Sequence, residues 1–125
     1  MDPKLVLQAA AAARMGLGVI LLAAPQLASR VIGAETGTAT ANLITRVAGV
    51  RDVVVGAGTL RATLTDDDPA AWGVGSAICD FSDSIAHVIA LRDLPRIRNI
   101  GTIVGAAGFG AAQLKAAIDL KKATD

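Results

Sequence analysis

The chain has 125 residues, of which 53% are hydrophobic and only 18% are charged, and its formal net charge is +1. This length suits a single domain of a few helices, and the balanced charge lacks the excess of Lys and Arg on which nucleic-acid-binding surfaces depend, so nucleic acid is excluded as a partner. With one cysteine, Cys79, and one histidine, His87, we expect no internal disulfide, no metal site and no cofactor.

The pattern of helix formers and helix breakers predicts an all-α protein. The first helix is rich in Ala and Leu and stops at Pro25. The second ends at the acidic tract 66–68, and Pro69 suits the first turn of the third helix, with Asp68 as its N-cap. Pro95 interrupts the chain before the fourth. We therefore expect an antiparallel, up-down four-helix transmembrane bundle in one domain, with helices at about 5–24, 41–63, 70–91 and 97–118.

The segment between the first two helices, at 25–40, is rich in Gly and polar residues and is expected to be a connection. One amphipathic turn at 26–32 would lie at a surface. The tail from Asp119 onward carries Lys121 and Lys122 and is expected to be solvated.

The breadth of apolar sequence favours a membrane. The longest uncharged runs, 15–29 and 99–114, fall short of the roughly 20 apolar residues that a spanning helix needs. Arg98 and Lys115 can nevertheless extend to opposite membrane surfaces, and the many small residues suit close packing between membrane helices. The sequence therefore predicts a multi-pass protein of the cell membrane with lipid as a partner. A soluble, Ala-rich helical bundle is the alternative.

Six ionisable side chains fall inside the predicted helices, three positive and three negative. Unpaired at the centre of a membrane, each would cost roughly 2.5 to 3.5 kcal/mol, and together on the order of 15 to 20 kcal/mol, more than the stability of a small domain. We therefore predict an internal ion-pair network. Its expected members are Arg14, Arg46, Arg51, Asp52, Asp80 and Asp83.

Two functions fit this network. Asp80, Asp83 and His87 are spaced i, i+3, i+7, so they share one helix face and are candidates for a proton relay or a catalytic pocket. Alternatively, the arginines and aspartates form a clamp that fixes how the helices pack, because the guanidinium fork suits carboxylate pairing. We favour the clamp, and with it a protein that is not an enzyme.

Glycines mark two helix faces for close packing. Gly49 and Gly56 share a face of the second helix with Arg46. On the fourth helix, Gly101, Gly105 and Gly108 contain a GxxxG and form a smooth groove, of the kind that packs against another helix. The partner would be a helix of the same bundle, a second copy or a larger membrane complex.

At these residues the chain resembles a family of small, uncharacterised four-helix bacterial integral membrane proteins. The likeness covers roughly the whole chain, implies the fold and the membrane location, and brings no activity with it. The residues that carry it are Ala24-Pro25, Gly33, the R-x-x-G-x-R-[DE] motif Arg46-Val-Ala-Gly49-Val-Arg51-Asp52, and the D-x-x-D motif Asp80-Phe-Ser-Asp83.

The expected function is that of an accessory, assembly or structural component of a membrane. The alternative is a small membrane enzyme or proton-coupled carrier that uses Asp80, Asp83 and His87. Four crossings would place both termini on one side, and the excess of basic residues there, five against four, predicts that this side is the cytoplasm. The five are Lys4, Arg61, Lys115, Lys121 and Lys122, and the four are Arg30, Arg92, Arg96 and Arg98.

Overall fold

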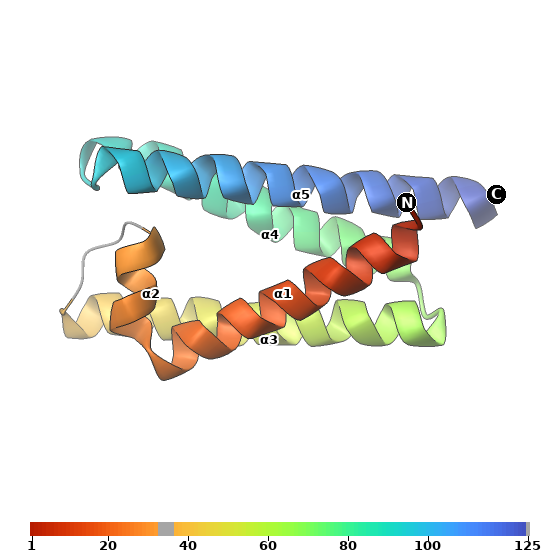
Figure 1. Ribbon diagram of the computed structural model, residues 1–125, viewed down its shortest axis with the longest axis horizontal. Coiled ribbons are helices and arrows are strands. Elements are labelled where there is room, and N and C mark those ends of the chain that lie inside the picture. The colour runs from red at the N-terminus through yellow and green to blue at the C-terminus, as the bar shows by residue number, and fades with distance from the viewer. Residues whose placement is uncertain (33–36, 125) are drawn as a thin grey trace.

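The computed structural model describes residues 1–32 and 37–124, and this part of the chain is helical (Figure 1). Its elements are α1 (Pro3–Ala23), α2 (Pro25–Ile32), α3 (Ala39–Thr65), α4 (Pro69–Ile89), the short 3-10 helix η1 (Ala90–Arg92) and α5 (Arg96–Thr124). The predicted all-α fold with four long helices is confirmed. Gly33, which belongs to the family motif, lies outside the described residues.

Local sequence signals set most of the helix ends. Asp68 caps α4, because its side chain accepts a hydrogen bond from the Ala71 backbone N–H at 3.1 Å, and Pro69 occupies the first turn, as predicted. Pro25 ends the first helix but also begins α2, so the predicted amphipathic turn is a helix of eight residues.

The C-terminal tail differs from the prediction. We expected the fourth helix to end near 118, whereas α5 continues to Thr124. Lys115 and Asp119 form an i, i+4 ion pair at 2.5 Å on this last stretch, an interaction that stabilises a helix. Two more lysines in the last turn interact favourably with the helix dipole.

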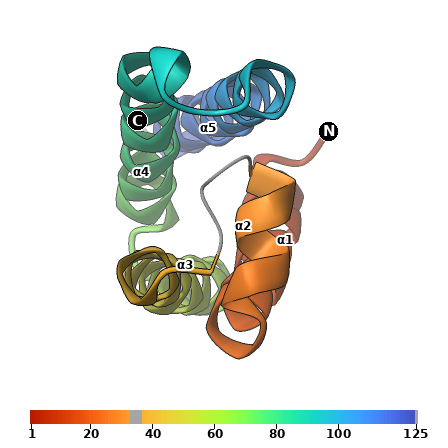
Figure 2. The same ribbon diagram turned by 90° about the vertical axis from the view of Figure 1, so that its left-hand side faces the viewer.

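The four long helices form two antiparallel pairs. α1 packs most extensively on α3, and α4 on α5, with fewer contacts between the pairs. Viewed end-on, the long helices occupy the four corners of a bundle (Figure 2). Both termini lie at one end, which we name the terminal end, and α2 lies at the other, which we name the α2 end (Figure 1).

Within the first pair, the backbones of α1 and α3 touch at glycines. A Cβ added to Gly18 of α1 would lie 2.7 Å from the carbonyl oxygen of Gly49. One added to Gly56 would lie 2.8 Å from the carbonyl oxygen of Ala11. Both distances are far below a normal contact, so these positions tolerate no side chain without a shift of the helices.

The glycine groove of α5 has no such neighbour. A Cβ added to Gly101, Gly105 or Gly108 would meet nothing within 4 Å. Among the described residues, no other helix packs against these glycines, so the structure does not show the expected packing of this groove within the bundle.

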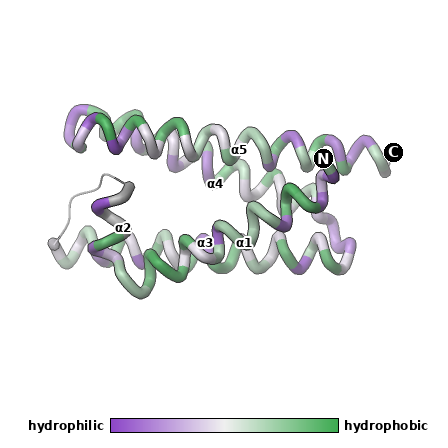
Figure 3. The backbone as a smooth tube through the Cα atoms, viewed as in Figure 1, coloured by the Kyte–Doolittle hydropathy of each residue, from purple (hydrophilic) through white to green (hydrophobic). Residues whose placement is uncertain are grey.

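The polarity of the bundle is inverted relative to a soluble protein. The buried side chains include Arg14, Asp52, Asp80, Asn99 and Gln113, whereas most of the large apolar residues are exposed, for example Ile97 at 88%. Hydrophilic residues otherwise gather towards the two ends (Figure 3). In water the large apolar side chains of a compact protein turn inward.

Three stretches of the described chain are long and apolar enough to cross a membrane, namely Pro3–Ala23, Pro69–Arg92 and Arg96–Ala123. α3 is not among them, although we expected four spanning helices. It carries four charged residues, Arg46, Arg51, Asp52 and Arg61, which lower its hydropathy.

Candidate functional site

Arg14 lies at the centre of the buried charges. Its side chain, only 3% exposed, projects from α1 towards α3 and α4. Nη1 donates to Asp52 Oδ1 at 3.0 Å, and Nη2 donates to Asp80 Oδ1 at 2.5 Å. Nη2 also donates to the backbone carbonyl of Ser76 at 3.3 Å. One guanidinium thus connects three helices.

Arg51 of α3 forms the outer half of the site. Its guanidinium donates two parallel hydrogen bonds to Asp83 of α4, from Nη1 to Oδ1 at 2.7 Å and from Nη2 to Oδ2 at 2.6 Å. This bidentate geometry is the strong form of an arginine–carboxylate pair. Arg51 also donates to Asp52 Oδ1, which joins the two halves. The Arg51 and Asp83 side chains are 33% and 36% exposed, so this half opens to the surroundings.

The fourth long helix contributes Gln113, which the sequence analysis missed. Its side-chain Nε2 donates to Asp80 Oδ2 at 2.6 Å, and the residue is fully buried. Because an ionised carboxylate only accepts hydrogen bonds, the amide nitrogen must face Asp80. Gln113 could have been singled out in the sequence, because it is a polar residue near the end of an apolar run in a helix of small residues.

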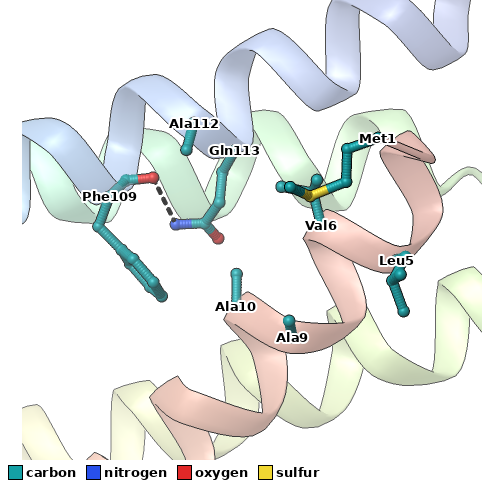
Figure 4. Close-up of a pocket in the computed structure, with 8 residues that line it drawn as sticks. All are labelled: Met1, Leu5, Val6, Ala9, Ala10, Phe109, Ala112 and Gln113. Carbon is teal, nitrogen blue, oxygen red and sulfur yellow. Dashed lines mark hydrogen bonds between the residues drawn. The ribbon is translucent and has the colours of Figure 1, made fainter.

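Gln113 also lines an apolar cleft of about 500 Å³ between α1 and α5. Figure 4 shows its amide reaching from α5 towards α1, with Phe109 and Ala10 nearby. Its amide oxygen has no hydrogen-bond partner among the residues that the structure describes. The cleft is otherwise lined by apolar side chains, so it offers no group for acid–base chemistry.

We name the set Arg14, Arg51, Asp52, Asp80, Asp83 and Gln113 the charge network. It links the two helix pairs, because α4 supplies Asp80 and Asp83 to arginines of the other pair. A hydrogen bond at 3.0 Å between the hydroxyls of Thr59 and Ser76 adds a further link from α3 to α4. The polar groups therefore add side-chain links between the two helix pairs to their apolar contacts, such as that of Trp72 in α4 with Gly58 in α3.

Arg46 does not belong to the network, and its inclusion in the prediction is wrong. The side chain is exposed and forms no ion pair with the part of the chain that the structure describes. The reason is helical geometry: at 3.6 residues per turn, Arg46 lies about 120° around α3 from the buried Asp52. It faces α2 instead, beside Asn42.

His87 lies on the same face of α4 as the two aspartates but bonds elsewhere. Its Nδ1 is 2.9 Å from the backbone oxygen of Asp83, one helical turn earlier. Its own backbone oxygen accepts from Asn99 of α5 at 3.0 Å. Among residues 1–32 and 37–124, no group of three His, Cys, Asp or Glu side chains is arranged to hold a metal ion.

No protein-family model, no curated protein and no solved structure matches this chain. What the site does must therefore be inferred from its own chemistry. That chemistry is five charged groups in direct contact, two positive and three negative, enclosed by apolar helices and partly open at Arg51 and Asp83.

Proposed function

We propose that the chain is a multi-pass integral membrane protein that serves as an accessory or assembly component, with the charge network as its internal clamp. The inverted polarity carries this proposal. Large apolar side chains such as Ile89 and Ile97 are 76% and 88% exposed, while arginine and aspartate are buried. Contiguous exposed apolar surface of this kind marks contact with lipid or with another protein.

We propose that α3 crosses the membrane as the fourth span despite its charges. Arg51 and Asp52 are paired inside the bundle, so they are not presented unpaired to lipid. Arg46 lies towards the α2 end, and Arg61 pairs with Asp67 at the terminal end. Long cationic side chains in such positions extend to the membrane surface. With Arg46 at the α2 end, each end carries five cationic side chains, so the excess of basic residues that predicted a cytoplasmic terminal end disappears.

The membrane location has a direct test. When the full chain is expressed in bacteria, we expect it to stay in the membrane pellet after alkaline carbonate washing and to enter solution only with detergent. Immunoblotting of the two fractions measures this. A monodisperse protein in the soluble fraction would show that the Ala-rich bundle is water-soluble and would overturn the proposal.

The open glycine face of α5 supports the assembly role. Gly101, Gly105 and Gly108 present backbone with no neighbour within 4 Å. Without a hydrophobic force between helices in lipid, association depends on close packing, and small residues permit it. We propose that a second copy or a helix of a larger complex packs here.

Substitution at the middle of this face tests the assembly role. We expect Gly105→Leu to separate the helices and to shift the assembled species to monomer on size-exclusion chromatography in mild detergent. Gly75→Leu is the matched control, because Gly75 of α4 also has open space around it but lies outside the groove. If Gly105→Leu elutes like the unaltered chain, no helix packs on this face.

A proton-coupled carrier or small membrane enzyme is the second candidate, and two observations favour it. The charged members of the network carry one more negative than positive charge, and the Arg51–Asp83 pair is partly exposed. A buried excess negative charge is costly, and binding a proton removes it. Asp80 and Asp83 are the groups that would take up the proton in such a carrier, with His87 beside them.

A further inference from the structure

The two ends of the bundle differ in how many of their cationic side chains form ion pairs. At the terminal end, three of the cationic side chains are paired with acids. These pairs are Lys4 with Asp66, Arg61 with Asp67 and Lys115 with Asp119. At the α2 end, no cationic side chain is ion-paired within residues 1–32 and 37–124. These side chains are Arg30, Arg46, Arg92, Arg96 and Arg98.

Two of these arginines line a cleft. Arg30 of α2 and Arg46 of α3 face a space of about 400 Å³ that also contacts Gln26 and Asn42. Arg98 of α5 reaches the same place, because its Nη1 donates to the backbone oxygen of Arg30 at 2.8 Å. Three helices thus bring three arginines together, and both arginines that line the cleft are exposed.

We propose that this cleft binds the phosphate of an anionic phospholipid headgroup. The planar guanidinium presents a fork of N–H donors that matches a phosphate in charge and geometry. Two arginines facing one polar cleft complement one phosphodiester. The third, Arg98, adds positive charge beside the cleft and is not ion-paired with residues 1–32 or 37–124.

The surroundings indicate a lipid rather than a free phosphate ion. Leu27 lines the same cleft and is 58% exposed, and Leu43 and Val47, which follow Asn42 and Arg46 in α3, are exposed as well. Apolar side chains beside a cationic cleft provide contact for acyl chains. The short amphipathic α2 lies at this end, where a helix of that kind rests in a membrane surface.

The inference rests on the membrane location proposed above, which carbonate extraction tests separately. If the chain fractionates with the membrane but binds no lipid selectively, the lipid-binding proposal fails and the membrane location stands. Loss of the chain to the soluble fraction would count against the membrane location.

The experiment uses the full chain, purified in a neutral detergent and mixed with equal amounts of phosphatidylglycerol and phosphatidylcholine. Native mass spectrometry measures how much of each lipid is retained. We expect phosphatidylglycerol to be preferred. The attraction of one arginine to an anionic membrane surface corresponds to about a fivefold change in affinity. Arg46→Gln should therefore weaken the retention of phosphatidylglycerol about fivefold, and the double variant Arg30→Gln with Arg46→Gln about 25-fold.

Arg92→Gln is the matched control, because Arg92 lies in η1 at the same end, is exposed and does not line the cleft. Its removal should change retention by less than about twofold. Equal retention of the two lipids by the unaltered chain would overturn the proposal. So would an equal loss in Arg92→Gln and Arg46→Gln, which would mean unspecific attraction to surface charge. Displacement of phosphatidylglycerol by millimolar inorganic phosphate would identify a free-anion site instead.

Discussion

Arg14→Met is expected to lower the free energy of unfolding by about 3 to 5 kcal/mol, because it leaves buried Asp80 without a cationic partner and Asp52 with Arg51 alone. Arg14 supplies donors to both Asp52 and Asp80, which are almost completely enclosed. Methionine replaces the apolar stem of arginine but not its guanidinium group, so the loss comes mainly from charge and hydrogen bonds. Thermal or denaturant unfolding in detergent, followed by circular dichroism, measures the effect.

The control is Arg46→Met, the same chemical change at an exposed arginine without an ion pair in the described chain. It should alter stability by no more than about 0.5 kcal/mol. A double-mutant cycle on Arg14 and Asp80 should give a clear coupling energy, since removal of both charges relieves part of the loss. Coupling near zero, or equal effects of the two arginine variants, would refute the clamp.

Asp83→Asn extends this test to the carrier hypothesis. The amide keeps a hydrogen-bond acceptor for Arg51 but binds no proton near neutral pH. A clamp loses stability in this variant, and its loss is coupled to Arg51. A carrier keeps its fold but no longer moves protons into reconstituted vesicles.

The second large effect is expected at the contact between α1 and α3. In Gly18→Ala, the new Cβ would lie 2.7 Å from the carbonyl oxygen of Gly49 and 2.9 Å from the backbone nitrogen of Val53. Backbone atoms cannot rotate away as a side chain does, so the helices must separate. We expect a loss of about 1 to 3 kcal/mol or more, from overpacking and from weakened contacts along the pair.

Gly16→Ala is the matched control on the same helix. Its Cβ would meet nothing within 4 Å, and alanine favours helix over glycine by up to about 1 kcal/mol. The control should therefore be neutral or stabilising, while Gly18→Ala unfolds at a lower denaturant concentration. Similar midpoints for the two variants would show that α1 and α3 are not held in this close contact.

Helix ends and buried charge were largely readable from the sequence. Pro25, Asp68 and Pro69 act through local backbone chemistry, so their effect needs no knowledge of the fold. Charges inside apolar helices must form pairs in any arrangement of the helices. For this reason the sequence correctly predicted that Arg14, Arg51 and the three aspartates belong to one ion-pair network. Which arginine pairs with which aspartate depends on helix rotation.

Arg46 was wrongly predicted to join the network because the rotation of α3 about its axis was not known. Several faces of α3 are apolar, so the sequence did not reveal that its buried face is the one with Gly49, Asp52 and Gly56. Gly18 was missed for a related reason. A single glycine in a helix of small residues forms no recognisable pattern. Gly18 matters for packing only because Gly49 of α3 lies opposite it.

The division of the charge network between the helix pairs bears on how the bundle is assembled. The first pair contributes two arginines and one aspartate, and the second contributes two aspartates. The first pair by itself therefore carries one excess positive charge, and the second carries two negative charges. When the helices are synthesised in order, α1 and α3 already have the Arg14–Asp52 pair, yet Arg51 lacks Asp83 until α4 arrives. The two halves thus attract each other, and neither is electrically neutral before they meet. A chain interrupted in the 66–68 loop would leave the first half with an unmatched arginine, and an unpaired charge inside a membrane is costly.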